Sequence, residues 1–283
     1  MNTRLDQTAV VSGQATAAEP AWRALVDAAR APYRAAGHFA WHFARGKLTL
    51  DPVFHYLFAS GQIAPGAKVV DIGCGQGLLA SLILACARRG AVWPAGWAEA
   101  PVGASVTGID LMPRDVQRAR AALGDAAQFI CADMRQAELP PCDVVVILDV
   151  LHYVDHAAQD DLLLRVRAAL GQRAAERPGP GKLLLRVGDQ HATLGFAISQ
   201  WVDRVVTRVR GHRAAPTHGR PLSAWTEHLR ELGFDVTPRP MSAGTPFANV
   251  LLVASLPASA SASASASAST PVPILIPATG AEA

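Results

Sequence analysis

The chain has 283 residues, half of them hydrophobic, and a formal net charge of +3 at pH 7, which suits one large α/β domain and offers no block of basic residues to follow nucleic-acid phosphates. Its four cysteines form no Cys-x-x-Cys pair, so neither a zinc site nor a disulfide framework is indicated. Because no apolar stretch is long enough to cross a bilayer and the first residues lack a signal-peptide pattern, we expect a soluble cytoplasmic protein without a membrane span.

The first 64 residues differ in character from the rest of the chain. Residues 1–18 are small and polar without a period, which predicts a disordered arm. Residues 19–64 carry apolar and aromatic side chains at helical spacing, which predicts a helical N-terminal cover. We expect most of these rings to pack the helices onto the domain; the alternative is that they face an aromatic or unsaturated ligand.

A glycine-rich turn follows the first apolar strand. The segment from Val69 to Gly77 runs Val-Val-Asp-Ile-Gly-Cys-Gly-Gln-Gly, and an apolar helical pattern comes after it. A strand, a glycine turn and a helix in this order form a nucleotide-binding unit, whose glycines allow the tight turn, ligand approach to bare backbone and close helix packing. The dinucleotide fingerprint Gly-x-Gly-x-x-Gly is not met, because Leu78 stands at its last position, which argues against NAD or FAD.

Strand and helix patterns then alternate along the chain. Strand patterns occur at residues 106–110, 127–131, 142–149 and 182–187, and helical patterns at 77–89, 113–123, 156–170 and 223–233. This order predicts a parallel sheet, closed by two further strands at 234–236 and 249–255. We therefore predict an α/β fold, a doubly wound, mostly parallel, seven-stranded Rossmann-like sheet, with a catalytic domain over residues 65–256.

Two further segments lie outside this alternation. Residues 193–213 predict an additional helix flanked by basic residues. We interpret this basic flank as a solvated face, with contact to an anionic acceptor as the alternative. Residues 257–283 begin with an Ala-Ser repeat that cannot bury a core, so we expect a disordered tail.

Taken together, these elements resemble the class I S-adenosylmethionine-dependent methyltransferases. The first motif of that family is an acidic residue followed by alternating glycines, here Asp71, Gly73, Gly75 and Gly77. Later strand ends match in the same order, with Asp110 after the second strand and Asp133 after the third. The resemblance covers residues 67–188, and an ordered set of motifs is far more specific than one motif alone.

The resemblance implies S-adenosylmethionine as the cofactor and assigns roles to individual residues. It implies that Asp110 accepts hydrogen bonds from the two ribose hydroxyls. Asp133 is implied to meet the adenine amino group, with Met134 packing on the ring. The other implied cofactor-binding residues are Asp71, Gly73, Cys74, Gly75, Gly77, Leu111 and Asp149.

Methyl transfer makes modest demands on the protein, because a sulfonium methyl group is already an electrophile. The enzyme mainly holds acceptor and methyl in line and excludes water. Where the acceptor must lose a proton, histidine is suited to take it. His152, after the fourth strand, and His191, after the fifth, are the candidate catalytic residues, with support of the pocket as the alternative role for His152. We expect no metal, because His38 and His42 share a helix face but have no third ligand.

We predict methyl transfer to a small-molecule acceptor. A fainter resemblance, of residues 43–48 and 51–54 to methyltransferases of bacterial aryl-polyene pathways, implies an aryl acid or a carrier-bound aryl thioester. Methylation of nucleic-acid amines is disfavoured, because residues 149–152 read Asp-Val-Leu-His where those enzymes carry Asn-Pro-Pro-Tyr. Two alternatives remain, an enzyme that transfers no methyl group and a non-catalytic nucleotide-binding protein on the same fold.

Overall fold

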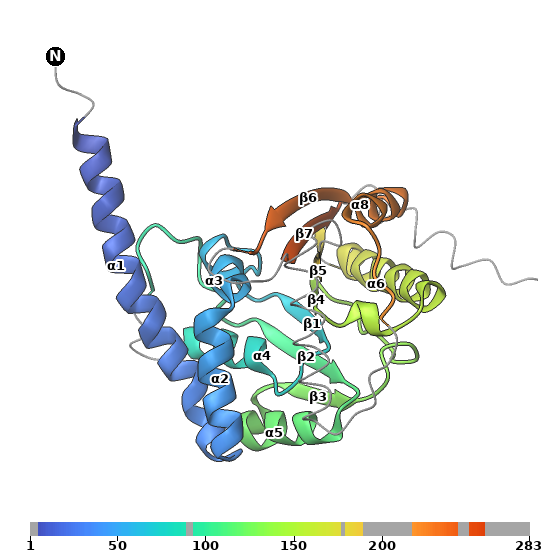
Figure 1. Ribbon diagram of the computed structural model, residues 1–283, viewed down its shortest axis with the longest axis horizontal. Helices are drawn as coiled ribbons and strands as arrows, with labels where there is room; N and C mark the ends of the chain where they lie inside the picture. Colours follow the sequence, from blue (N-terminus) through green and yellow to red (C-terminus); the bar gives the residue numbers. More distant parts are fainter. Residues whose placement is uncertain (1–4, 89–92, 177–178, 189–216, 243–248, 258–283) are drawn as a thin grey trace, which may run out of the picture.

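The computed structural model describes residues 5–88, 93–176, 179–188, 217–242 and 249–257, with side chains from residue 18 onward (Figure 1). The additional helix predicted at 193–213, the candidate His191 and the tail from residue 258 lie outside the described residues. In the part of the chain that is described, no helix combines the length and apolar character needed to span a membrane.

Seven strands form one sheet in the order β3-β2-β1-β4-β5-β7-β6. Strands β1 to β5 run parallel, whereas β7 pairs antiparallel with both β5 and β6. The predicted mostly parallel seven-stranded sheet is therefore confirmed, and its final pair of strands is antiparallel. The strands are β1 (Lys68–Ile72), β2 (Ser105–Asp110), β3 (Gln128–Cys131), β4 (Val144–Leu148), β5 (Gly181–Gly188), β6 (Asp235–Pro240) and β7 (Asn249–Leu256).

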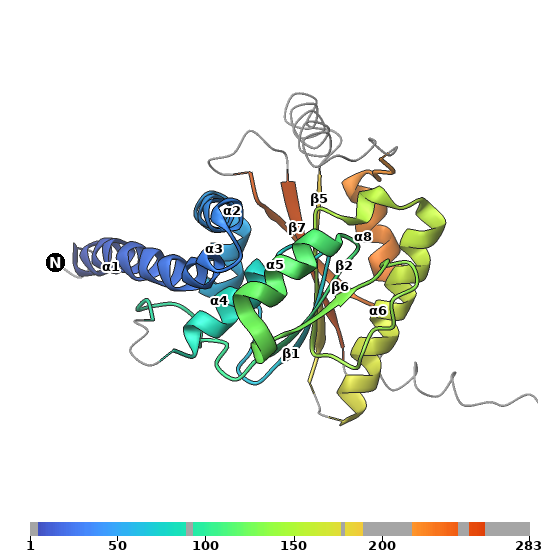
Figure 2. The same cartoon turned by 90° about the horizontal axis from the view of Figure 1, so that it is seen from below.

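Helices cover both faces of the sheet, as Figure 2 shows. On one face lie α1 (Leu5–Arg30), η1 (Ala31–Arg34), α2 (His38–Leu50), α3 (Pro52–Ala59), α4 (Leu78–Cys86) and α5 (Pro113–Leu123). On the other lie α6 (His156–Glu176) and α8 (Leu222–Glu231). The described residues also include two short 3-10 turns, η2 (Gly124–Ala126) and η3 (Leu151–Tyr153).

Alternation along the central strands divides the interior into two cores. Val69 on β1 and Val146 on β4 belong to the core under α1 to α5, whereas their neighbours Val70 and Val145 belong to the core under α6 and α8. Side chains of a strand point to alternate faces, and these strands are covered on both, so they are apolar at nearly every position. This is why the sequence shows continuous Val, Ile and Leu runs there.

The N-terminal cover contributes buried side chains to the core under α1 to α5. Trp22 on α1, Tyr33 on η1 and Leu48 on α2 are at most 5% exposed and belong to the same hydrophobic cluster as residues of α4. The cover is divided by prolines: Pro32 lies in the 3-10 turn after α1, and Pro52 begins α3. The predicted helical cover is thus present and α1 begins at Leu5, while the domain limits at residues 18, 64 and 256 stay predictions.

Candidate functional site

The glycine loop between β1 and α4 has three glycines with φ of +76°, +54° and +77°, at Gly73, Gly75 and Gly77. A Cβ at Gly73 would lie 2.5 Å from Val150, and one at Gly77 would lie 2.7 Å from the ring of Phe129. A Cβ at Gly75 would meet nothing within 4 Å. The outer two glycines therefore permit packing, whereas the middle one borders open space, where a ligand can approach bare backbone.

Asp110, at the end of β2, is joined to this loop. One oxygen of its carboxylate accepts a hydrogen bond from the Gly75 amide at 2.8 Å, and the other accepts from the Met112 amide at 2.8 Å. The side chain of the next residue, Leu111, is 59% exposed. The carboxylate thus stands beside the open face of the loop, with an apolar side chain next to it.

Two buried groups, one at the end of β1 and one within the loop, have raised pKa values. Asp71 is 5% exposed, and burial, reinforced by the charge of Asp110, raises the pKa of its carboxyl to about 7. Burial likewise raises the pKa of the Cys74 thiol far above its ordinary value, with the same two carboxylates adding to the shift. Cys74 is therefore a neutral packing group and no nucleophile.

Asp133 and Met134 follow β3, where the sequence predicts the adenine site. The carboxylate of Asp133 accepts a hydrogen bond from Arg135 Nε at 2.9 Å, and this bond is the main reason that its pKa lies below the ordinary range. The Met134 side chain is partly buried against the core under α6 and α8. The main-chain carbonyl of Met134 accepts a hydrogen bond from Arg165 at 2.8 Å. Both residues therefore lie on the β3 side of the carboxyl edge.

A cluster of charges occupies the opposite half of this edge, at the ends of β4 and β5. Arg186 on β5 is 2% exposed and donates to Asp149 at 2.8 Å and to Asp51 at 2.8 Å, with a second bond to each carboxylate. Lys47 on α2 lies 2.7 Å from Asp51 and 3.9 Å from Asp149. Two cations and two anions are thus paired, and they join the N-terminal cover to the sheet.

Electrostatics within this cluster follow from its burial. Burial alone would raise the pKa of the Asp51 carboxyl, but the hydrogen bonds and charges of Arg186 and Lys47 outweigh it and hold that pKa well below its ordinary value. Asp149 adopts φ +60°, a conformation that aspartate tolerates better than most residues. Its carboxylate, predicted to bind cofactor, is engaged by Arg186.

Arg186 is a site residue that sequence reasoning missed. The signal was present, since one arginine interrupts the apolar run Leu183-Leu184-Leu185-Arg186-Val187 of a strand expected to be buried. A buried cation requires anionic partners. Its partner Asp51 is 135 residues away in the sequence. The sequence therefore shows that Arg186 needs an anionic partner but does not show which residue it is.

The cover also holds the glycine loop directly. The Tyr33 hydroxyl donates to the carbonyl of Gln76 at 2.8 Å, and the Gln76 side-chain amide donates to the carbonyl of Ala40 at 3.0 Å. Tyr33 is fully buried, which raises the pKa of its phenol far above the ordinary value and keeps the donor proton in place. Loop, η1 and α2 therefore form one hydrogen-bonded unit.

A family model described as a methyltransferase domain matches residues 40–238, well over half of the chain. The chain belongs to the methyltransferase-domain family. The class I S-adenosylmethionine-dependent methyltransferase predicted from the order of the motifs is thereby confirmed, with S-adenosylmethionine as its cofactor. Among curated protein sequences, none matches this chain.

Several solved structures share the fold. The mitomycin 7-O-methyltransferase MmcR aligns with a TM-score of 0.52 at 22% identity, over 77% of this chain and 56% of that one. The pyocyanin biosynthetic protein PhzM aligns with 0.51 at 18% identity, over 76% and 57%. An O-methyltransferase family protein from Burkholderia thailandensis gives 0.50 at 18%, over 79% and 62%. This chain therefore spans little more than half the length of these structures, and identities this low show a common fold alone.

The residues present in this chain fit the cofactor. The space beside Gly75 is open, as a bound nucleotide requires. In addition, the side-chain oxygen of Gln76, a residue 3% exposed, is buried without a hydrogen-bond partner among the described residues. An open backbone surface and a buried acceptor in the same loop are features of a ligand site.

Of the two candidate catalytic histidines, the structure describes His152. It lies in η3, directly after β4, and its ring packs against Tyr153 with the centroids 4.2 Å apart. Burial lowers the pKa of the His152 imidazole, and the nearby charge of Asp149 only partly opposes this. The ring is therefore neutral at pH 7 and able to accept a proton.

His38 and His42, considered as a metal pair, lie on α2 with their Nε2 atoms 3.1 Å apart. Within the described ranges, no group of three or more His, Cys, Asp or Glu side chains is arranged to hold a metal ion. The pair is exposed on the cover, and the guanidinium groups of Arg30 and Arg34 lie 5.0 and 5.5 Å from the ring centroid of the neighbouring Trp41, so its surroundings are cationic.

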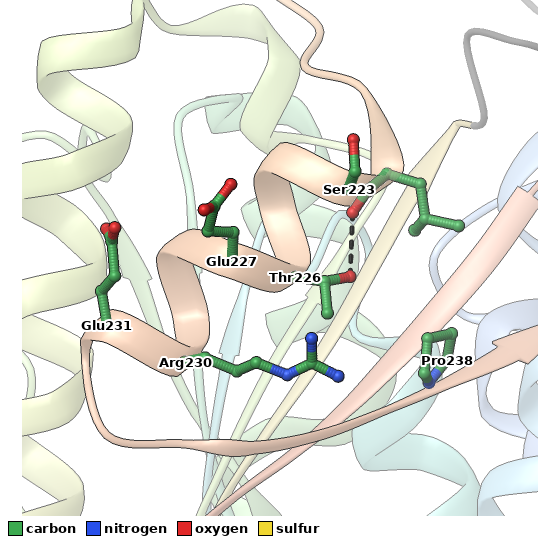
Figure 3. Close-up of a pocket in the computed structure, with 7 residues that line it drawn as sticks. Ser223, Thr226, Glu227, Arg230, Glu231 and Pro238 are labelled. Atoms are coloured by element: carbon green, nitrogen blue, oxygen red, sulfur yellow. Dashed lines mark hydrogen bonds between the residues drawn. The ribbon is translucent and has the colours of Figure 1, made fainter.

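A surface groove unrelated to this edge runs along α8 and β6 (Figure 3). Its wall includes Ser223, Glu227 and Arg230 of α8 and Pro238 of β6. Thr226, which also lines it, donates to the carbonyl of Leu222 within the helix at 2.8 Å. None of the predicted cofactor or catalytic residues lines this groove, so it has no part in the site described above.

Proposed function

We propose that this protein transfers the methyl group of S-adenosylmethionine to a small-molecule acceptor at the carboxyl edge of the sheet. The observation that carries the proposal is the glycine loop, open at Gly75 and joined through the Gly75 amide to the carboxylate of Asp110. In open α/β sheets, ligands bind outside the carboxyl ends of the strands. In this chain that edge also carries Asp110, the acidic residue that would accept hydrogen bonds from the ribose.

The cofactor-binding roles follow from this arrangement. Asp110 would accept from the ribose hydroxyls while it continues to hold the loop, and the exposed Leu111 would cover one side of the nucleoside. Asp133 would meet the adenine amino group beside Met134. Asp149 would form the wall on the β4 side, because about a third of its side chain is exposed although its charge is paired with Arg186.

The acceptor we propose is an aryl compound. Large apolar side chains are exposed on elements that meet at this edge, namely Phe39 on α2, Leu111 after β2 and Tyr153 after β4. Flat apolar surfaces suit an aromatic ring. An aryl acid or a carrier-bound aryl thioester is the more specific proposal, supported by the faint aryl-polyene resemblance of the segment around Lys47 and Asp51.

Methyl transfer depends more on the position of the acceptor than on acid or base catalysis. The bound cofactor supplies a methyl group on a sulfonium, and the protein holds the acceptor in line and excludes water. Where the acceptor carries an exchangeable proton, His152 is our candidate base, because its neutral ring follows the end of β4. His191 keeps the same proposed role as the second candidate.

The first test is calorimetric titration with S-adenosylmethionine and S-adenosylhomocysteine, with NAD as the comparison. We expect binding of the two sulfur nucleotides alone, weakened by roughly 1.5–3 kcal/mol in Asp110→Ala, because two ribose hydrogen bonds and the bond to Gly75 are lost. Unchanged affinity in that variant would remove Asp110 from the site.

Turnover is then tested with methyl-labelled S-adenosylmethionine, beginning with aryl acids and aryl thioesters. Labelled product would establish the acceptor class, and His152→Gln should then lower kcat while S-adenosylhomocysteine binds as before. Selective cofactor binding without any methylated product would instead favour the non-catalytic binding protein. Absence of binding to the folded protein would refute the proposed function.

A further inference from the structure

Gln76 is the one side chain of the glycine loop that is both polar and buried. It stands between Gly75, beside open space, and Gly77, packed against Phe129, and it is 3% exposed. A buried amide needs partners at both of its ends, because neither end can be satisfied by bulk water. Its two ends have different surroundings in this structure.

The nitrogen end of the amide is fixed by the cover. Gln76 Nε2 donates to the carbonyl of Ala40 at 3.0 Å, and Ala40 lies on the buried face of α2. The main-chain carbonyl of Gln76 is held separately by the Tyr33 hydroxyl at 2.8 Å. Since a carbonyl accepts only from the NH₂ group, these contacts determine which end of the amide is the oxygen.

The oxygen end has no hydrogen-bond partner among the described residues. An unpaired buried acceptor costs free energy, so it is expected to find a donor in the working state of the protein. The backbone around it is already committed, because the Gly75 amide donates to Asp110 and the Gly77 amide donates to the Cys74 carbonyl. A donor supplied by a ligand is therefore the simplest partner.

The cofactor has three kinds of donor: the adenine amino group, the ribose hydroxyls and the α-amino group of its methionyl part. In the proposed function, adenine and ribose are bound on the β3 and β2 side, at Asp133 and Asp110. Gln76 is anchored against α2 through Ala40, and the α-amino group is the one donor of the cofactor to which no acceptor has been assigned. We propose that Gln76 Oε1 accepts a hydrogen bond from this amino group, an inference that rests on the proposed function.

Such a contact would give Gln76 two roles through one amide. Its oxygen would distinguish ligands that carry the amino group from those that lack it. Its nitrogen would connect the bound methionyl part to α2 through Ala40, on the helix that also carries Phe39 and Lys47. Cofactor binding would in this way stabilise the cover over the acceptor.

The test compares two ligands on matched variants of the full chain. S-adenosylhomocysteine carries the amino group, whereas 5′-methylthioadenosine shares its adenine, ribose and thioether but lacks the amino acid. The variants are Gln76→Leu, which removes the acceptor, and Gln76→Glu, which keeps an oxygen there. Ser81→Ala is the control, because Ser81 donates to the Ala29 carbonyl across the same interface between α4 and the cover. Thermal unfolding of each variant checks that it is folded.

We expect Gln76→Leu to weaken S-adenosylhomocysteine about ten- to a hundredfold and methylthioadenosine by less than about twofold, since a hydrogen bond to a charged group is lost only with the first. Gln76→Glu should bind S-adenosylhomocysteine more tightly than Gln76→Leu, and Ser81→Ala should bind both ligands as the natural chain does. Equal weakening of both ligands by Gln76→Leu would overturn the inference, because it would show a purely structural role. Wild-type protein that binds neither ligand would refute the proposed function itself.

Discussion

The two halves of the carboxyl edge satisfy their polar groups in opposite ways. At the ends of β1 and β2, glycine backbone faces open space, a carboxyl beneath the loop has its pKa raised by burial, and the oxygen of Gln76 lacks a partner in the described chain. At the ends of β4 and β5, Arg186 is buried and both of its carboxylate partners, Asp51 and Asp149, are engaged.

This difference separates the residues that would bind the cofactor from the residues that stabilise the fold. Polar groups that the protein leaves open or unpaired carry a free-energy cost that a ligand can relieve, so they mark where the cofactor belongs. Groups that are fully paired have little left to offer a ligand, and removing one of them leaves a buried charge uncompensated. The first half should therefore respond to substitution mainly in affinity, and the second mainly in stability.

The largest effect on affinity is expected at Gly75. Gly75→Val should lower the affinity for S-adenosylhomocysteine by at least about a hundredfold, or about 2.7 kcal/mol, because the side chain would fill the space the ligand needs. Gly124→Val is a matched control, since Gly124 has φ +55° and open surroundings but precedes β3, at the opposite edge. Both positions have a φ near +55°, which strains a valine at either of them, so equal losses of affinity in the two would show that the space beside Gly75 is not the site.

The second prediction concerns Arg186. Arg186→Met should destabilise the fold by about 3–5 kcal/mol, because Asp51 and Asp149 would be left without their buried cation. Urea unfolding at neutral pH measures this. Arg23→Met serves as the comparison, since the Arg23–Glu19 pair is exposed and contributes little. A small change in the Arg186 variant would mean that the cluster is solvated and does not hold the cover.

The smallest of the three effects comes from Asp71. Its pKa of about 7 in the folded chain lies above the unfolded value of about 3.9, so the protonated form favours folding. Its contribution is present below about pH 4 and is lost as pH rises to about 7 and beyond. Relative to the natural chain, Asp71→Asn should therefore gain on the order of 2–3 kcal/mol of stability between about pH 5 and about pH 8.

That prediction is checked by urea unfolding of both proteins across this range. Groups that titrate away from Asp71 contribute equally to the two and cancel in the difference, whereas Asp110, whose charge acts on Asp71, does not cancel. A difference in stability that does not change with pH would show that Asp71 is ionised in the folded chain. The result would then place a charge under the glycine loop, beside Asp110, whose burial other groups must offset.

The sequence by itself determined most of the fold and half of the site. Alternating apolar strands and helices predict a parallel sheet, because burial on both faces requires continuous apolar runs such as residues 144–148. The glycine spacing from Gly73 to Gly77 and the acid Asp110 are likewise local, since backbone conformation and position after a strand decide their use. These features depend on residues that are neighbours in the sequence. They can therefore be predicted from one short segment at a time.

Only the tertiary structure decided which distant groups meet. Arg186 and Asp51 are 135 residues apart, and Tyr33 and Gln76 are 43 apart. A pattern shows that a buried arginine or glutamine needs a partner, but the partner depends on how the cover crosses the carboxyl edge. Packing therefore determined that the cover holds the glycine loop at one end of α2 and the charged cluster at the other, because hydrogen bonds and ion pairs require atoms to meet within about 3–4 Å.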